Sequence, residues 1–176
     1  MKAVASLNHA KSALFGLFAG AVWMFWSIAF VGSAAKFWAP TVTVLALIVL
    51  SWSIFRVRFI RHRIASSADS TFANMFGWKF RCVVALEFLL AGGTVLFLIS
   101  THRSQMIPVA VAFSVGLHFL PLAKLFRMPT LYITGISMAL IAAVSLAIPH
   151  ANIRNVVVCV GVGISMWVRS LVALHR

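Results

Sequence analysis

Six long apolar runs constrain the fold of this chain more than any other feature. Each run is close to the roughly 20 residues that an α-helix needs to cross a bilayer, where backbone hydrogen bonds must be made within the helix. Of the 176 residues, 62% are hydrophobic and 10% are charged, whereas soluble domains carry about 25% charged residues. We therefore predict an all-α, polytopic transmembrane helical bundle, a single membrane domain over residues 1–176. The predicted spans are 14–35, 37–55, 80–100, 107–125, 130–149 and 156–174, with ends defined to about two to four residues.

The basic residues fall in the short gaps between these runs and are divided unequally between the two sides of the membrane. Twelve are predicted on one side: Lys2, Lys11, Arg56, Arg58, Arg61, Arg63, Lys79, Arg81, Lys124, Arg127, Arg169 and Arg176. Three are predicted on the other: Lys36, Arg103 and Arg154. Because Lys and Arg accumulate in cytoplasmic loops, we predict that both termini and the second and fourth loops are cytosolic.

The excess of 15 Lys and Arg over two acidic residues would indicate nucleic-acid binding if the cations formed one patch. They are spread over several loops instead, so no nucleic-acid partner is expected. One basic stretch alternates with apolar residues and contains Arg56, Arg58, Arg61 and Arg63. It is interpreted as a cytosolic extension of the second helix that contacts anionic inner-leaflet head groups among the membrane lipids. A docking surface for a protein partner or an anionic ligand is the alternative.

Three ionisable residues fall inside predicted spans, where each costs at least about 2.5 kcal/mol unless it has a partner or water. Glu87, His118 and Arg169 each lie about 9 to 10 Å inward from the predicted cytosolic edge, at 1.5 Å per residue. Hydroxyl residues recur on the same helical faces: Thr94, Ser114 and Ser165. We predict that Glu87 contacts His118 or Arg169 in a polar pocket open to the cytosol, and that these six residues bind a substrate or ion.

Simpler interpretations of the same three residues stay open. Arg169 can extend to the inner head groups, Glu87 can pair with a basic residue at the start of its own helix, and His118 can be a core histidine with a hydrogen-bond partner. The motif Gly16-x-x-x-Gly20 in the first span is predicted to allow close helix packing.

Familiar catalytic spacings are missing, and no catalytic residue, metal site or cofactor is predicted. Cys82 and Cys159 are predicted in opposite leaflets, too far apart for a disulfide, as small buried hydrophobic residues.

The segment from His118 to Pro129, HFLPLAKLFRMP, is followed by Tyr132 and Gly135. It resembles a stretch of small uncharacterised bacterial multi-pass membrane proteins, over about the fourth and fifth spans. The resemblance implies a location in the bacterial cytoplasmic membrane and brings no known activity.

The leading functional hypothesis is a small-solute or proton-linked transporter or channel-like protein, because ionisable groups inside membrane helices often mark solute or proton paths. The alternative is a non-catalytic binding or accessory membrane subunit, in which the polar residues only fix helix packing. A lipid-acting membrane enzyme ranks third, since no nucleophile or metal site is evident. Whether the chain associates with a second copy or with a protein partner is left open.

Overall fold

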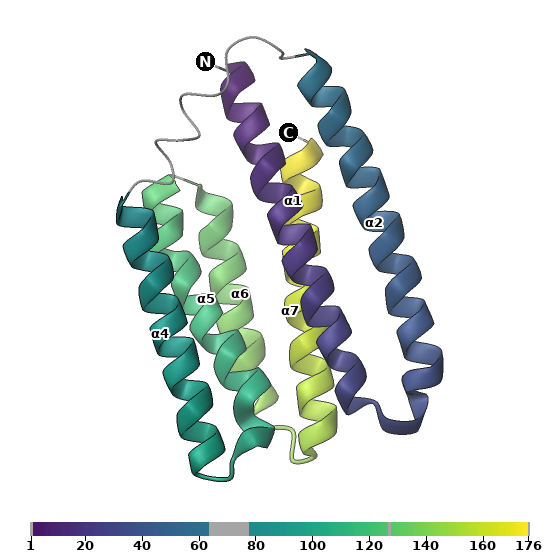
Figure 1. The fold of residues 1–176 in the computed structure, drawn as a ribbon, viewed down its shortest axis with the longest axis vertical. Coiled ribbons are helices and arrows are strands. Elements are labelled where there is room, and N and C mark those ends of the chain that lie inside the picture. Colours follow the sequence, from purple (N-terminus) through teal and green to yellow (C-terminus); the bar gives the residue numbers. More distant parts are fainter. Residues whose placement is uncertain (1, 64–77, 127, 176) are drawn as a thin grey trace.

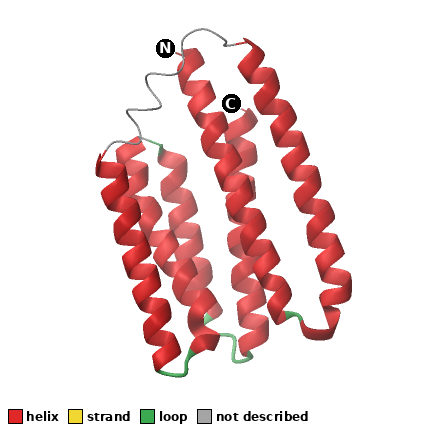
Figure 2. Cartoon of the chain, viewed as in Figure 1, coloured by secondary structure: helices red, strands yellow, loops and turns green. Residues whose placement is uncertain are grey.

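The computed structural model describes residues 2–63, 78–126 and 128–175, and all regular structure in these residues is helical (Figures 1 and 2). The six α-helices are α1 (Lys2–Ser27), α2 (Ala35–Arg63), α4 (Trp78–Ser100), α5 (Ile107–Phe126), α6 (Pro129–Ser145) and α7 (Ala151–His175). Short 3₁₀ turns join α1 to α2, η1 (Ile28–Phe30) and η2 (Gly32–Ala34), and a third, η3 (Ser104–Met106), precedes α5. The predicted all-α fold is confirmed.

Five helical stretches of the described chain are long and apolar enough to cross a membrane. They are Ala13–Phe30, Gly32–Phe55, Arg81–Ser100, Ser104–Phe126 and Ala151–Ala173. Two of the six predicted spans, 80–100 and 107–125, coincide with such stretches to within three residues at each end. The first, second and last predicted spans differ by five residues at one end, because the first stretch ends at Phe30, the second begins at Gly32 and the last begins at Ala151.

The predicted span 130–149 is too long, since α6 ends at Ser145 and has only 17 residues. Pro149 explains this end: its ring would clash with the carbonyl of Ser145 in a continuing helix, and it has no N–H to donate. At 1.5 Å per residue α6 is about 26 Å long, at the lower limit for a helix that crosses a hydrocarbon core of about 30 Å.

The helices pack side by side in the spatial order α4, α5, α6, α7, α1, α2 (Figure 1). Helices α2 and α4 therefore lie at opposite edges of the bundle, although they are consecutive among the described helices. The start of α1 and the end of α7 lie at the same end of the bundle, which we call the N/C end. The connections α1–α2, α4–α5 and α6–α7 lie at the other end, which we call the far end.

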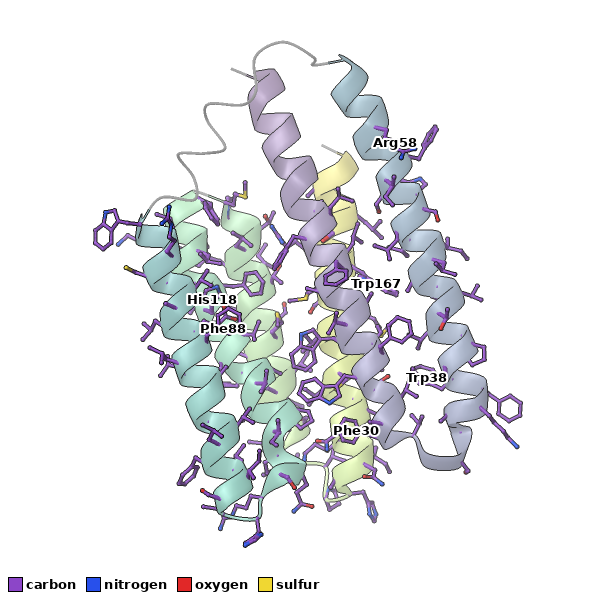
Figure 3. The ribbon with its side chains drawn as sticks, viewed as in Figure 1. Phe30, Trp38, Arg58, Phe88, His118 and Trp167 are labelled. Atoms are coloured by element: carbon purple, nitrogen blue, oxygen red, sulfur yellow. The ribbon has the colours of Figure 1, made fainter. Side chains whose placement is uncertain are left out.

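Glycines allow α1 and α7 to approach closely. A Cβ atom at Gly16 would collide with Ser170, and one at Gly20 would collide with Trp167 and lie 3.0 Å from the carbonyl oxygen of Gly163. Trp167 (labelled in Figure 3) donates a hydrogen bond from Nε1 to the carbonyl oxygen of Leu17, at 3.0 Å. The predicted packing role of the Gly16-x-x-x-Gly20 motif is confirmed.

Buried apolar side chains form two clusters that share α7. The larger joins α5, α6 and α7 to Trp23 of α1, and the smaller joins α1, α2 and α7. Cys159 is buried in the larger cluster, as predicted. The prediction for Cys82 is wrong: this residue is exposed, because α4 is an edge helix that packs mainly against α5.

Candidate functional site

Glu87 and His118 form a close polar contact between α4 and α5 (Figure 3, where His118 is labelled). The carboxylate oxygen Oε2 of Glu87 lies 3.0 Å from the imidazole nitrogen Nε2 of His118. The side chains are 20% exposed for Glu87 and 9% exposed for His118. One of the two contacts predicted for Glu87 from the depth of the residues is therefore present in the structure.

The position of Glu87 follows from the single packed face of α4. Its neighbours in sequence, Leu86 and Phe88, are exposed, whereas Val83 and Ala91, one turn away on either side, are half-buried. Residues four apart share a helical face, so Glu87 lies on the face that α5 covers. An acidic side chain on the opposite face of α4 would meet lipid if this helix spans a membrane.

His118 lies beside an aromatic ring and a proline of its own helix. Its ring meets the ring of the next residue, Phe119, edge-on, with the ring centres 6.2 Å apart. Three residues later Pro121 lies inside the helix, and its missing N–H leaves the carbonyl of Leu117 without its usual intrahelical donor. The imidazole is thus placed beside a weakened turn of α5.

The chemistry available to this pair is proton exchange. A carboxylate and an imidazolium attract one another through a charge-assisted hydrogen bond. If one proton passes from the imidazolium to the carboxylate, both groups become neutral, and the pair then exchanges protons as one coupled unit. A Glu–His contact in a low-dielectric setting can therefore take up or release a proton without any metal or cofactor taking part.

Arg169, the third predicted ionisable residue, lies in a different helix contact. A Cβ atom at Gly16 of α1 would be 3.4 Å from the Nη1 atom of Arg169, so the guanidinium belongs to the α1–α7 contact. The Glu87–His118 pair belongs to the α4–α5 contact. Similar depth along three helices therefore still leaves the guanidinium at a different helix contact from the acid and the imidazole.

The predicted hydroxyl ligands are placed as follows. Thr94 donates to the carbonyl oxygen of Leu90 at 2.7 Å, and Ser165 donates to that of Val162 at 2.9 Å, so both bond within their own helices. Ser114 is half-buried on α5, one turn before His118. Binding of a substrate or ion by these residues stays a prediction.

Most of the predicted head-group cluster lies outside the described side chains. The backbone of α2 is helical through Arg63, as expected for an extension of the second span, and Arg58 is exposed. The side chains of Arg56, Arg61 and Arg63 are not described, so lipid contact stays a prediction. Within the described residues no group of three or more His, Cys, Asp or Glu side chains could hold a metal ion.

The sequence reasoning missed two buried polar residues at the far end, Arg154 and Asn155, which are 7% and 1% exposed. Arg154 was predicted only as a loop cation. A helical period would have indicated its burial, because it continues the buried face of α7. That face comprises Arg154, Asn155, Val158, Cys159, Val162, Gly163, Met166, Trp167 and Ser170.

Comparison with protein families, curated proteins and solved structures gave no match for this chain. The functional argument therefore depends on the geometry of the chain itself, and the resemblance of the segment 118–129 to bacterial membrane proteins stays a prediction.

Proposed function

We propose that the chain is an integral membrane protein that crosses the bacterial cytoplasmic membrane six times, with both termini in the cytosol. Five helices meet the length and hydropathy criteria for spanning, and α6 is a shorter apolar helix. An even number of crossings agrees with the placement of both chain ends at the N/C end of the bundle (Figure 1). The excess of Lys and Arg near that end favours the cytosol, where anionic head groups would contact the extension of α2.

For the activity, we propose a proton-linked transporter or channel-like protein that conducts protons also without added solute, with Glu87 and His118 as the proton-carrying pair. The observation that carries this proposal is the 3.0 Å contact between the two side chains, inside two of the apolar stretches. Ionisable groups at such positions are costly and usually mark a solute or proton path. A purely structural contact between α4 and α5 could be made by apolar side chains, without that cost.

We further propose that water reaches the pair from the cytosolic side. Glu87 lies six residues after Arg81, the first residue of the apolar stretch of α4, which is about 9 Å along the helix. Its side chain keeps 20% of its surface exposed, whereas that of His118 keeps 9%. Because Glu87 is the more exposed of the two side chains, we propose that it receives the proton from water. His118 then accepts the proton from Glu87 and releases it deeper into the bundle.

The test uses proton flux, because the solute is unidentified. The purified chain is reconstituted in liposomes that contain a pH-sensitive dye, and a potassium diffusion potential drives protons inward. We expect acidification with the wild type, and its loss in Glu87→Gln and in His118→Gln. The matched control is His102→Gln, which removes an exposed histidine from the α4–α5 connection and should leave the flux unchanged.

Two results would count against this function. The first is a wild-type protein, correctly inserted, that moves no protons with any imposed potential. The second is flux in Glu87→Gln and His118→Gln equal to that of the wild type, which would remove the pair from the path.

A second candidate is a non-catalytic accessory membrane subunit, favoured by the wide exposure of the edge helix α4. Large apolar side chains such as Leu89 and Leu96 are exposed there, and a partner could cover them. This role predicts a stable complex in mild detergent. That complex should be lost when Arg56, Arg58, Arg61 and Arg63 are neutralised together, if the basic extension of α2 holds the partner.

A further inference from the structure

Arg154 differs from the other cations at the far end because protein, rather than open space, surrounds it. Only 7% of its surface is exposed, and its Nε atom has no hydrogen-bond partner in the described part of the chain. Lys36 and Arg103, at the same end, are exposed. An arginine that merely extends from a helix to the head groups keeps its long side chain on the outside of the bundle. The bundle instead encloses Arg154.

A buried guanidinium requires a negative partner, because desolvating an unpaired charge costs several kcal/mol. The chain has only two acidic residues, Asp69 and Glu87. Glu87 is engaged by His118. Asp69 is outside the described residues, between α2 and α4, whose flanking ends lie at the N/C end. Among the described residues no carboxylate lies within ion-pair distance of Arg154, and we expect the negative charge that Arg154 requires at the far end to come from outside this chain.

The first turn of α7 adds donors for such an anion. The first intrahelical hydrogen bond runs from the backbone N–H of Arg154 to the carbonyl oxygen of His150, at 2.9 Å. The backbone N–H groups of residues 151–153 precede it and have no acceptor within the helix. Side chains on a helix lean toward its N-terminus, and from this we infer that the guanidinium of Arg154 approaches these donors. The positive end of the helix dipole adds to the attraction.

The connection between α4 and α5 is hydrogen-bonded to the first turn of α7. Asn155 donates from Nδ2 to the carbonyl oxygen of Gln105 at 3.1 Å, which ties α7 to the η3 turn. The surroundings of Arg154 are therefore held in place by a specific contact between two elements, rather than by a mobile loop.

We propose that Arg154 and the first turn of α7 form a binding site for an anionic phosphate group. A planar guanidinium matches phosphate oxygens with two parallel hydrogen bonds, and free backbone N–H groups bind the same chemistry. The group comes either from the head group of an anionic phospholipid or from free phosphate. Arg154 lies four residues into α7, at the start of its apolar stretch, which is the level at which lipid phosphates are found.

The test compares the wild type with Arg154→Gln and with Arg103→Gln, each purified in uncharged detergent. Arg103→Gln removes an exposed charge from the same end and is the matched control. Native mass spectrometry measures retention of phosphatidylglycerol against zwitterionic phosphatidylcholine. Thermal unfolding is followed with sodium phosphate against sodium chloride at equal ionic strength.

We expect the wild type and Arg103→Gln to bind phosphatidylglycerol at least about thirtyfold more tightly than Arg154→Gln. Stabilisation by sodium phosphate alone, lost only in Arg154→Gln, would support the same site with free phosphate as its ligand. If Arg154→Gln loses neither response relative to Arg103→Gln, the proposal is overturned.

If Arg154→Gln does not fold, binding by the wild type and by Arg154→Lys tests the proposal instead. The wild type should bind phosphatidylglycerol or sodium phosphate saturably. Arg154→Lys, which keeps the charge but lacks the planar guanidinium, should bind the same probe more weakly. A wild type that responds to neither probe contradicts the proposal.

Discussion

Gly116→Ala should force α5 and α6 apart. A Cβ atom at Gly116 would lie 2.8 Å from the carbonyl oxygen of Gly135 and 2.9 Å from the backbone nitrogen of Ala139. Both neighbours are backbone atoms, so no change of side-chain rotamer relieves the overlap. Ordinary contacts begin at 3.4 Å, and reaching that distance from 2.8 Å requires a local helix displacement of about 0.6 Å.

The expected cost follows from comparison with a glycine in open space. Extra methyl groups in well-packed interiors usually cost about 1–3 kcal/mol. Gly93 on α4 has no atom within 4 Å of an added Cβ, so Gly93→Ala gains the helix propensity of alanine without a collision. Gly116→Ala gains the same propensity, and the difference between the variants isolates the packing cost. We expect a difference of about 2 kcal/mol, roughly a thirtyfold change in the unfolding equilibrium.

The assay is equilibrium unfolding in mixed micelles, with sodium dodecyl sulfate as the denaturant and tryptophan fluorescence and circular dichroism as the signals. Gly116→Ala should unfold at a lower denaturant fraction than the wild type, and Gly93→Ala at an equal or higher one. Equal unfolding midpoints for the two variants would refute the close α5–α6 contact on which the fold depends.

Two further predictions concern the other half of the bundle and the thiols. Trp38→Phe removes the 2.7 Å hydrogen bond from Nε1 of Trp38 to the Oγ atom of Ser27. It should lower the free energy of unfolding by about 1 kcal/mol. An unchanged free energy of unfolding in the same assay would contradict this hydrogen bond. In native protein in detergent, a maleimide should modify exposed Cys82 and spare buried Cys159, as read by mass spectrometry of peptides, and rapid modification of Cys159 would contradict the packing of α7.

Most of the fold could be predicted from the sequence because each helix overlaps an apolar run. Glycine spacing in the first span also indicated a close helix contact, although not that α7 is the partner, since small residues four apart permit close approach. The end of α6 was missed because the apolar run continues past Ser145, whereas Pro149 terminates the helix. Composition alone does not show that Pro149 ends the helix, because three more apolar residues, 146–148, follow Ser145.

The candidate site could be predicted only in part. Counting residues along each helix indicated that Glu87 and His118 lie at a similar depth in the membrane. It did not indicate which helices are neighbours. Arg169 has a similar depth and lies at the α1–α7 contact instead. The burial of Arg154 does not follow from its place in a short predicted loop, and only the helical period of the buried face of α7 indicates it.

The central claim is that hydrocarbon surrounds a bundle whose two termini share the cytosolic side of the membrane. Cysteine labelling of intact cells tests it, in a background that lacks Cys82 and Cys159. Single cysteines are placed at Ser33, in the exposed α1–α2 connection, and after the last residue of the chain. We predict that a membrane-impermeant maleimide modifies the cysteine at position 33 in intact cells and the terminal one only after permeabilisation. Modification of the terminal cysteine in intact cells, with position 33 protected, would contradict the orientation, and modification of neither site or of both before permeabilisation would contradict the crossing itself.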